Sequence, residues 1–319
     1  MQVKLPISVL IPTMNRPETL RNTIKSYLNA DHLPSQIVVI DQSEDESCQV
    51  DNKNVLKTLC NDIVEYNYVF QNEPSLTKAR NVAISYAKNE IVICSDDDII
   101  VYSNTIQCIY EIMKRKEIAL IAGIDDNAKA TNSKIGYFFG TKSFLKRKIG
   151  YVTKSVLGRY PQKITGETET EWAMGYFFVI RKSLIKKWGI KWDENLISYA
   201  YPEDLDFSYW YCRCAKNENY KCVLNEKVHV KHMVSTEYRV PSKKSTYMYV
   251  INRLYLSYKH KMGFSSRVAQ KWCNFWMLVN RFIKKENYKD MAAAMRIARK
   301  YKTQIAKGEL SMVYDKYLK

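Results

Sequence analysis

One short stretch, Asn89–Ile100 (NEIVICSDDDII), constrains this chain more than any other. Residues Ile91–Ser95 form a short run of buried character between polar residues, which is typical of an interior strand of a parallel sheet. The carboxylates Asp96–Asp98 follow at once, and the next apolar run, Ile99–Val101, is expected to pack back into the core. The acidic turn should therefore lie at the carboxyl end of the strand, where open α/β sheets bind their ligands.

Three adjacent carboxylates repel one another, and each raises the pKa of its neighbours unless positive charge is close by. A divalent cation held by hard oxygen ligands would supply that charge, with a substrate phosphate completing the coordination. A solvated acidic turn without a ligand is the alternative for Asp96–Asp98 taken alone. The rest of the chain has to decide between the two interpretations.

The first hundred residues repeat a strand followed by a helix. Strands are expected at Ile7–Ile11, Gln36–Ile40, Val64–Phe70 and Ile91–Ser95, with helices at 17–30, 55–60 and 76–88. This alternation predicts a parallel, doubly wound sheet, and right-handed crossovers place the polar strand ends on one edge. The Pro12–Arg16 turn, Asp41 and the acidic turn should then line one crevice. Its composition suits a nucleotide, with carboxylates for ribose hydroxyls and Arg80 for phosphate.

Composition narrows the class of protein. The 319 residues include only 10 glycines, roughly half the usual share, and neither GxGxxG nor GxxxxGK[ST] occurs. This argues against a dinucleotide-binding fold or a P-loop, so a bound diphosphate would be neutralised by a metal. Eight scattered cysteines without a CxxC pair, and no signal peptide, are typical of free thiols in a reducing cytosol. No run of 18 apolar residues occurs, so no membrane span is expected.

Taken together, several segments resemble the family 2 glycosyltransferases, which move a sugar from a nucleotide donor to an acceptor. The resemblance is carried by ISVLIPTMNR, IVVIDQSED, SLTKARNVAI, ICSDDDII, WAMGYFFVIRKS and YPEDLDFSYW, and it extends over about residues 5–235. It implies the α/β GT-A fold, a Rossmann-like and mostly parallel sheet flanked by helices, here with a C-terminal helical extension. The bacterial surface-polysaccharide enzymes are the type that the chain resembles.

The resemblance also implies roles for residues near the donor. Pro12, Thr13, Asn15 and Arg16 would border the base and ribose, Asp41 would contact one of them, and Arg80 and Asn81 would lie near the donor. Asp96 or Asp97 would bind ribose, and Asp98, together with Asp96, the metal. Gln42 and Ser43 stand where the family commonly has a second Asp and a Gly. The nucleotide base therefore stays open, with a UDP- or dTDP-sugar as the expected donor.

A second acidic cluster occurs at Tyr201–Asp206 (YPEDLD). Pro202 followed by carboxylates suits the start of any helix, which is the structural interpretation. The chemical interpretation needs one carboxylate to deprotonate an acceptor hydroxyl as it attacks the anomeric carbon. The resemblance makes Asp204 this base and Glu203 its support. One base and a metal-held leaving group imply direct displacement with inversion at the sugar carbon.

Two further features bear on the site. His229 and His232 alternate across an extended segment, so only one of them is expected to face the site, and the resemblance favours His232 as a metal ligand. A nitrogen ligand beside carboxylates fits Mn²⁺ as well as Mg²⁺. Gly175, within an apolar run, indicates that a sugar or another packed segment approaches the backbone closely.

The net charge of +17 is concentrated in the C-terminal part. Residues 227–319 contain 21 Lys and Arg against 5 Asp and Glu, whereas residues 1–226 contain 29 against 28. Helices are expected after Pro241, and one helix face carries an apolar stripe with basic margins: Trp272, Phe275, Trp276, Val279, Phe282 and Ile283. Such a stripe either packs on the preceding domain or lies in a membrane interface. The excess of positive charge favours a combination of the two: one face of the helices packs on the preceding domain, and the cationic rim contacts anionic lipid.

The sequence thus predicts a GT-A catalytic domain over residues 1–235 and a basic helical extension over 236–319. The expected protein is an inverting, metal-dependent enzyme at the cytoplasmic face of the membrane, acting on a glycan or lipid-linked acceptor. Residues 125–170 are expected to form either an acceptor loop or a plain surface excursion. The alternative is a non-catalytic α/β protein that binds either a membrane surface or a nucleic acid. Such a protein would need neither acidic cluster, and no nucleic-acid-binding motif occurs in the sequence to support nucleic-acid binding.

Overall fold

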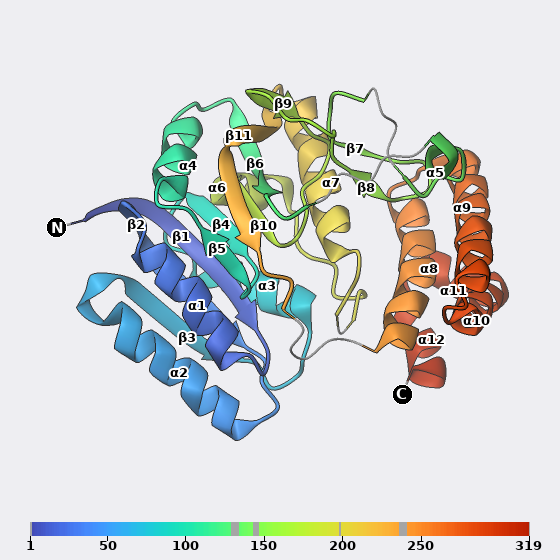
Figure 1. Ribbon diagram of the computed structural model, residues 1–319, viewed down its shortest axis with the longest axis horizontal. Helices are drawn as coiled ribbons and strands as arrows, with labels where there is room; N and C mark the ends of the chain where they lie inside the picture. Colours follow the sequence, from blue (N-terminus) through green and yellow to red (C-terminus); the bar gives the residue numbers. More distant parts are fainter. Residues whose placement is uncertain (1, 129–133, 143–146, 198, 236–240, 319) are drawn as a thin grey trace.

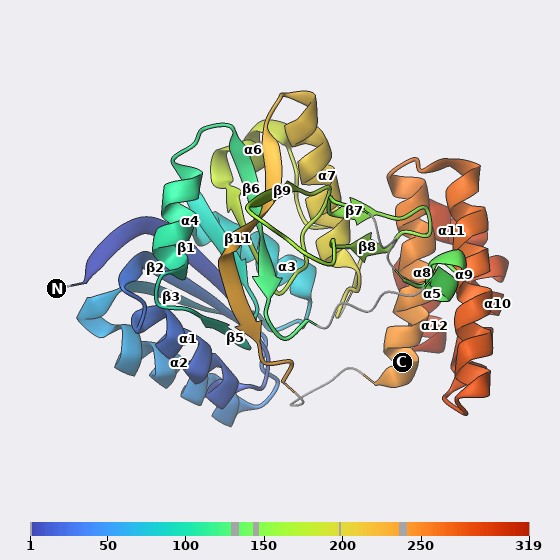
Figure 2. The ribbon, with the colours of Figure 1, turned by 45° about the horizontal axis from the view of Figure 1, so that its top comes forward.

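The computed structural model describes residues 2–128, 134–142, 147–197, 199–235 and 241–318 (Figure 1). A nine-stranded mixed sheet with helices on both faces occupies the N-terminal two thirds of the described chain. A group of helices at the C-terminal end packs against one side of this α/β part (Figures 1 and 2). The predicted α/β class with a C-terminal helical extension is confirmed.

The first half of the sheet is parallel, as the alternation of strands and helices predicts. The strands lie in the order β3–β2–β1–β4. Their elements are β1 (Val3–Thr13), α1 (Pro17–Leu28), β2 (His32–Asp41), α2 (Glu46–Cys60), η1 (Asn61–Ile63), β3 (Glu65–Phe70), α3 (Leu76–Tyr86) and β4 (Ile91–Ser95). Thr13 and Asp41 are register partners at the ends of β1 and β2, so these ends adjoin.

Helix α2 is longer than the expected 55–60. It begins at Glu46 because the Asp45 side chain caps it by accepting a hydrogen bond from the Ser47 N–H. The added turns carry few buried apolar residues, so their periodicity gave no signal for a helix.

The second half of the sheet contains antiparallel strands that the alternation did not indicate. The elements of this part of the chain are β5 (Ile99–Val101), α4 (Thr105–Met113), β6 (Ile118–Asp125), α5 (Lys134–Phe138), β7 (Tyr151–Val152), β8 (Gly158–Arg159), β9 (Glu167–Glu169), β10 (Phe177–Arg181), α6 (Lys182–Trp188), α7 (Glu203–Asn217) and β11 (Lys221–His232). Of these, β7 and β8 form a separate two-stranded sheet. β10 runs antiparallel between β4 and β6, and β11 pairs with β5 and β9 in the same sense. Consequently the start of β10, at Phe177, lies opposite Ser95, and the end of β11, at His232, lies opposite Ile99.

Each face of the sheet has its own hydrophobic core. One core packs α1, α2 and α4 onto the sheet, and the other packs α3, α6 and α7 onto the opposite face (Figure 2). Alternate residues of β4 supply both cores, with Ile91 and Ile93 on one side and Val92 and Cys94 on the other. A strand buried on both faces reads as a continuous apolar run, which is how β4 appears in the sequence.

The C-terminal helices are α8 (Ser242–Lys259), α9 (Gly263–Ile283), α10 (Tyr288–Lys300), α11 (Lys302–Lys307) and α12 (Leu310–Tyr317). Their buried residues share a third core with Trp172, Leu196 and Leu205 of the α/β part. Lys259 and His260 also contact the buried Asp206 of α7, at 2.6 and 2.7 Å. The expected domain boundary, between 235 and 236, borders residues 236–240, which lie outside the described residues, so the division stays a prediction.

Two findings concern the cell-biological expectations. Among the described residues, no helix combines the length and the apolar character needed to cross a bilayer. All eight cysteines are present as free thiols.

Candidate functional site

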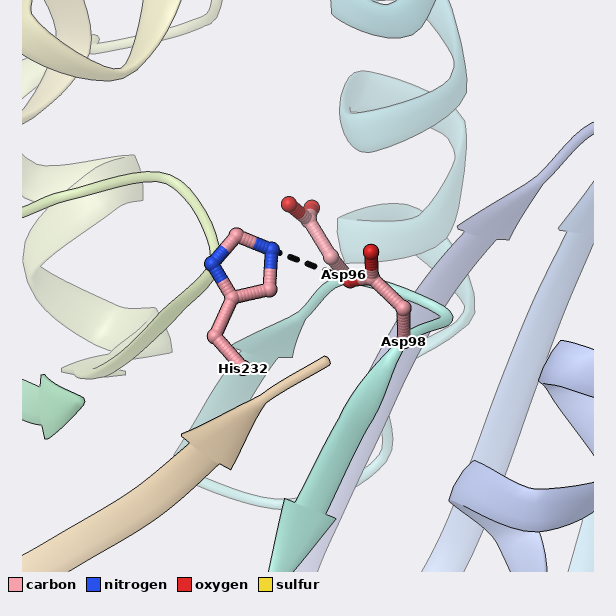
Figure 3. Close-up of side chains that lie close together, drawn as sticks. All are labelled: Asp96, Asp98 and His232. Carbon is pink, nitrogen blue, oxygen red and sulfur yellow. Dashed lines mark ion pairs between the residues drawn. The ribbon is translucent and has the colours of Figure 1, made fainter. Parts of the chain in front are cut away.

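The acidic turn after β4 brings Asp96 and Asp98 close to His232 at the end of β11 (Figure 3). One potential ligand atom from each of the three side chains lies within 4.8 Å of the others. Nε2 of His232 is 3.2 Å from Oδ1 of Asp98, and Oδ2 of Asp98 accepts a hydrogen bond from the Ser235 N–H at 3.0 Å. The strand after the turn, β5, is buried at Ile99 and pairs with β11, so the predicted return to the core is confirmed.

Electrostatics in this cluster follow from burial and from the pairing of opposite charges. Burial raises the pKa of Asp96 to about 6, partly offset by the charge of Arg80. For Asp98, burial is outweighed by the hydrogen bond and charge of His232, so its pKa lies below the usual range. Burial opposes the charged form of His232, but Asp98 outweighs it and the pKa of His232 is raised. The cluster therefore holds at least one ionised carboxylate.

The middle carboxylate, Asp97, turns away from this cluster. Its oxygens accept hydrogen bonds from Thr13 Oγ1 at 2.7 Å and from Arg16 Nη1 at 3.1 Å. Burial raises the pKa of Asp97 to about 7, against the opposing charge of Arg16. Asp97 thus fastens the acidic turn to the Pro12–Arg16 turn, and both lie at adjoining strand ends.

Arg80 of α3 joins the two acidic clusters. Its Nη2 lies 3.0 Å from Asp96 Oδ1, 3.5 Å from Glu203 Oε1 and 3.0 Å from the carbonyl oxygen of Gly175. The guanidinium is buried, yet the charges of Glu203 and Asp96 outweigh the cost of burial and raise the pKa of Arg80. The second acidic cluster, at the start of α7, therefore meets the first around one cation.

Asp204 is held by the backbone on both sides. Its Oδ2 accepts a hydrogen bond from the Gly175 N–H at 2.9 Å, and its Oδ1 accepts one from the Leu205 N–H at 2.8 Å. A side chain at Gly175 would place its Cβ 2.9 Å from the Asp204 Cβ, so the glycine is required for this approach. The close approach expected at Gly175 is thus made by α7. Burial raises the pKa of Asp204, opposed by these two N–H groups.

Two of the expected donor residues are engaged by hydrogen bonds within the protein. The Asp41 carboxylate is fully buried and accepts hydrogen bonds from the Ser43 N–H and hydroxyl, from Asn52 and from Tyr68. Asn15 has a positive φ of 55° and bonds through its N–H to the Ser43 hydroxyl. Both residues shape the ends of β1 and β2, and direct contact with a nucleotide stays a prediction for them.

Asn81 is not brought to the acidic clusters. Its side-chain amide bonds to both the N–H and the carbonyl of Trp192 and to Glu194. Arg80, its neighbour in sequence, faces the site, because successive residues of a helix point in different directions. Asn81 instead ties α3 to the segment before α7.

The structure adds two residues that no sequence pattern had selected. Tyr176 stacks on His232 with ring centroids 5.1 Å apart, and its carbonyl accepts a hydrogen bond from the Asp96 N–H. Ser235 donates its N–H to Asp98. Tyr176 precedes an apolar strand and so reads as a core residue, and the role of Ser235 is carried by backbone, which has no sequence signature.

The cluster opens onto a cavity of about 790 Å³ beside Asp98, between α1 and β5. Its wall includes Thr19 and Asn22 of α1 and Met233. A ligand can therefore reach a carboxylate of the cluster from this side. Together, the groups offer two carboxylates and an imidazole for a cation, a buried guanidinium for an anion, and a half-buried carboxylate, Asp204, for a proton.

Glu203 is expected to make the stability of the metal-free protein depend on pH. Burial raises its pKa from 4.5 to about 8, against the charge of Arg80. The folded chain then keeps a proton that the unfolded chain releases, so the free energy of unfolding falls as pH rises from about 4.5 to 8, by up to about 1.4 kcal/mol per pH unit. Urea unfolding in EDTA at several pH values should show a shallower fall for Glu203→Gln. The exposed Glu117→Gln variant should keep the original slope, and an unchanged slope in Glu203→Gln would contradict the protonated form.

Comparison with solved structures found several nucleotide-sugar enzymes, and comparison with curated proteins found no match. A crystal structure of GalNAc-T7 with UDP, GalNAc and Mn²⁺ has a TM-score of 0.59 and 19% identity, and the match covers 93% of this chain and 58% of that chain. The mannosyltransferase PcManGT from Pyrobaculum calidifontis, in complex with GDP-Man and Mn²⁺, has a TM-score of 0.54 and 12% identity, with coverage of 98% and 87%. TarS 1-349 from S. aureus in complex with UDP has a TM-score of 0.52 and 15% identity, with coverage of 98% and 91%.

At these identities the likeness is one of fold, and it supports the predicted GT-A architecture. The family model described as Glycosyl transferase family 2 matches residues 8–189, from β1 through α6. This range includes the acidic turn and Arg80, whereas Glu203, Asp204 and His232 lie beyond it. Because the match spans more than half of the chain, the protein belongs to glycosyl transferase family 2.

Proposed function

We propose that this protein is an inverting, metal-dependent glycosyltransferase that moves one sugar from a UDP- or dTDP-sugar to a hydroxyl group of an acceptor. The observation that carries the proposal is the meeting of two acidic clusters, 107 residues apart in sequence from Asp96 to Glu203, around Arg80. A protein that only binds a membrane or a nucleic acid would need neither cluster. The family membership supports the transferase class, and the geometry supports the choice of residues.

The residues present fit a divalent cation. Asp96, Asp98 and His232 offer oxygen and nitrogen atoms within 4.8 Å of one another, a donor set suited to Mn²⁺ and acceptable to Mg²⁺. Solved neighbours of the same fold contain Mn²⁺, which supports this assignment. When bound, the cation would supply positive charge that stabilises the departing nucleoside diphosphate. Ser235 and Tyr176 orient Asp98 and His232.

Asp204 is the proposed base. Its carboxylate takes the proton of the acceptor hydroxyl while that oxygen bonds to the anomeric carbon and the bond from this carbon to the diphosphate oxygen breaks. Attack from the side opposite the leaving group inverts the sugar carbon. The N–H groups of Gly175 and Leu205 fix the carboxylate, and Glu203 supports the site through its contact with Arg80 at 3.5 Å. A positioned base of this kind contributes about 10²–10⁴-fold to the rate.

The proposed donor site borders the acidic turn on the side of β1 and β2. Pro12, Thr13 and Arg16 would line it, with Asn15, Asp41 and Asp97 holding its shape and Asp96 reaching the ribose. Arg80 would hold the negative charge of Asp96 in place beside the diphosphate. The UDP present in two of the solved neighbours supports a uridine or thymidine nucleotide.

The proposed acceptor is a glycan, carried on a lipid or otherwise close to a membrane, in bacterial surface-polysaccharide assembly. The excess of basic residues after residue 226 supports a location at the inner face of an anionic membrane. Residues 1–235 would then form the catalytic domain, and residues 236–319 the helical extension that packs on it. Residues 125–170, of which 129–133 and 143–146 lie outside the described residues, contain α5 and the β7–β8 hairpin and would contribute to the acceptor side.

A thermal-shift screen of nucleotide sugars, with and without Mn²⁺, tests this function. We expect a UDP- or dTDP-sugar to raise the melting temperature of the full chain only when Mn²⁺ is present, and EDTA to remove the shift. ATP with Mn²⁺ is the matched control, because it brings phosphate charge without the pyrimidine. Equal stabilisation by every nucleotide, or none by any nucleotide sugar, would count against the proposal.

A further inference from the structure

Helix α9 carries its apolar face outward. Its buried residues are Ser266, Gln270, Cys273 and Asn274, three of them polar. By contrast, Phe275, Phe282 and Ile283 are 46%, 62% and 72% exposed. An ordinary surface helix has the opposite orientation, with its apolar side on the core. The stripe expected from the sequence therefore exists, but most of it faces away from the protein.

The polar inner face of α9 has a structural cause. Arg253 of α8 is fully buried, and its guanidinium donates hydrogen bonds to the carbonyl oxygens of Ser155 and Val156 and to the Asn274 side chain. A buried guanidinium has to find acceptors, and α9 provides one of them. The register that presents Asn274 to Arg253 turns the aromatic residues of α9 outward.

Helix α5 extends this aromatic face. Phe138 lies edge-on to Trp272 at a centroid distance of 5.7 Å, and Phe139 stacks on Trp276 at 3.9 Å. The Trp272 indole donates a hydrogen bond to the Phe138 carbonyl at 3.0 Å. In both views α5 lies against α9 on the side of α8 that faces away from the sheet (Figures 1 and 2). We call the exposed apolar residues of the two helices the α5–α9 surface: Ile135, Phe138, Phe264, Val268, Trp272, Phe275, Phe282 and Ile283.

The sequence around this surface is strongly basic. Residues 134–166 contain eight Lys and Arg and no Asp or Glu, and residues 263–289 contain six against one. Exposed cations from α9 and the turn after it, among them Lys271, Lys284 and Lys285, adjoin the aromatic residues. A wide aromatic surface with a cationic rim matches the two layers of a bilayer interface, acyl chains beneath anionic headgroups.

We propose that the α5–α9 surface seats on an anionic lipid bilayer, with its aromatic residues in the interface and its basic rim on the headgroups. The assignment deepens the membrane-proximal acceptor of the proposed function and rests on it for biological meaning, although lipid binding itself requires no sugar transfer. A second copy of the chain is a poorer occupant. In a two-fold interface the same basic rim would face itself, and like charges would oppose association.

Vesicle sedimentation of the full chain tests the proposal. We expect the protein to bind vesicles of phosphatidylglycerol and phosphatidylcholine at least about tenfold more tightly than vesicles of phosphatidylcholine alone, with affinity falling as salt increases. The triple variant Phe275→Ser/Phe282→Ser/Ile283→Ser should weaken binding at least about tenfold. These side chains are exposed in the free protein and would supply much of the apolar area that the bilayer buries. Reversal of the rim, Lys271→Glu/Lys284→Glu/Lys285→Glu, should remove most of the salt dependence.

The matched control replaces three similarly exposed apolar residues of the α/β part, Val50→Ser/Ile63→Ser/Tyr86→Ser, and should bind vesicles like the wild type. A second measurement compares the wild type with Trp272→Phe: brominated lipids should quench the tryptophan fluorescence of the wild type, and the variant should show less quenching. Vesicle binding that survives the triple variant Phe275→Ser/Phe282→Ser/Ile283→Ser would overturn the proposal. So would a dimer that this variant converts to monomers while the wild type ignores vesicles.

The nucleotide thermal shift separates this proposal from the proposed function. All variants of the α5–α9 surface should keep the Mn²⁺-dependent shift, because none of the altered residues touches the acidic clusters. Vesicle binding without any nucleotide shift would leave the lipid surface in place and count against the transferase. A Mn²⁺-dependent rise in melting temperature with nucleotide sugar, but without vesicle binding, would support the transferase and overturn the lipid-binding surface.

Discussion

An Asp98→Ala variant is expected to lose Mn²⁺-dependent binding of the nucleotide sugar and to transfer sugar at least about 10³-fold more slowly than the wild type. Asp98 is the carboxylate of the cluster whose pKa is lowered, so it brings a full negative charge to the proposed cation at neutral pH. It also fixes His232, at 3.2 Å. Removing it leaves Asp96, which Arg80 already engages. The measurements are the thermal shift with UDP-sugar and Mn²⁺ and the rate of nucleoside diphosphate release.

The chain contains a matched control for this variant. Asp126, which follows β6, pairs at 2.6 Å with His229, a histidine of the same strand, β11, as His232. It therefore forms the same kind of carboxylate–imidazole contact outside the acidic clusters. Asp126→Ala should retain the Mn²⁺-dependent shift and most of the activity. If Asp98→Ala also retained the shift, the metal role of Asp98 would have to be abandoned.

The second large effect is expected from Asp204→Asn, which should bind donor and Mn²⁺ like the wild type but lose about 10²–10⁴-fold in transfer. Asparagine keeps the shape of the side chain but cannot take a proton from the acceptor. It can also accept only one of the two N–H groups that now hold Asp204, so a small loss of melting temperature is expected as well. Single-turnover transfer rates, compared with donor affinities, separate the two effects.

Glu203→Gln distinguishes the two neighbouring carboxyl groups. Because the pKa of Glu203 is raised to about 8, the group is largely protonated at neutral pH, and glutamine imitates that form. We expect this variant to lose far less activity than Asp204→Asn. A comparable loss in Glu203→Gln, with turnover kept in Asp204→Asn, would move the role of base to Glu203.

The sequence predicted the part of the site that local pattern can reveal. The buried run of β4 and the carboxylates after it form one contiguous signal, and the repeated strand–helix pattern places the ends of β1, β2 and β4 together. The selection of His232 over His229 needed the family resemblance. The structure brings His232 to Asp98, and its binding of a metal stays a prediction.

Other parts depend on contacts between distant segments, which periodicity does not encode. The antiparallel insertion of β10 carries Gly175 and Tyr176 to the acidic turn, although the strand itself reads only as an apolar run. The burial of Asp41 follows from Asn52 and Tyr68, residues that have no pattern of their own. The inner face of α9 meets a buried arginine of another helix through Asn274, a contact that the stripe alone does not reveal, so the stripe could not tell which side faces the protein.

The contacts of Asp206 give α7 two tasks within one helical turn. Asp204 is the proposed base, whereas Asp206, two residues further on, is paired with Lys259 and His260 of α8. Helix α8 shares a core with the other C-terminal helices. The proposed base and the helices of the proposed lipid surface are thus linked through directly contacting elements. If the α5–α9 surface lies on a bilayer, these contacts set the distance between the membrane and Asp204. The depth of insertion would then determine how long a lipid-linked acceptor has to be for its hydroxyl group to reach Asp204.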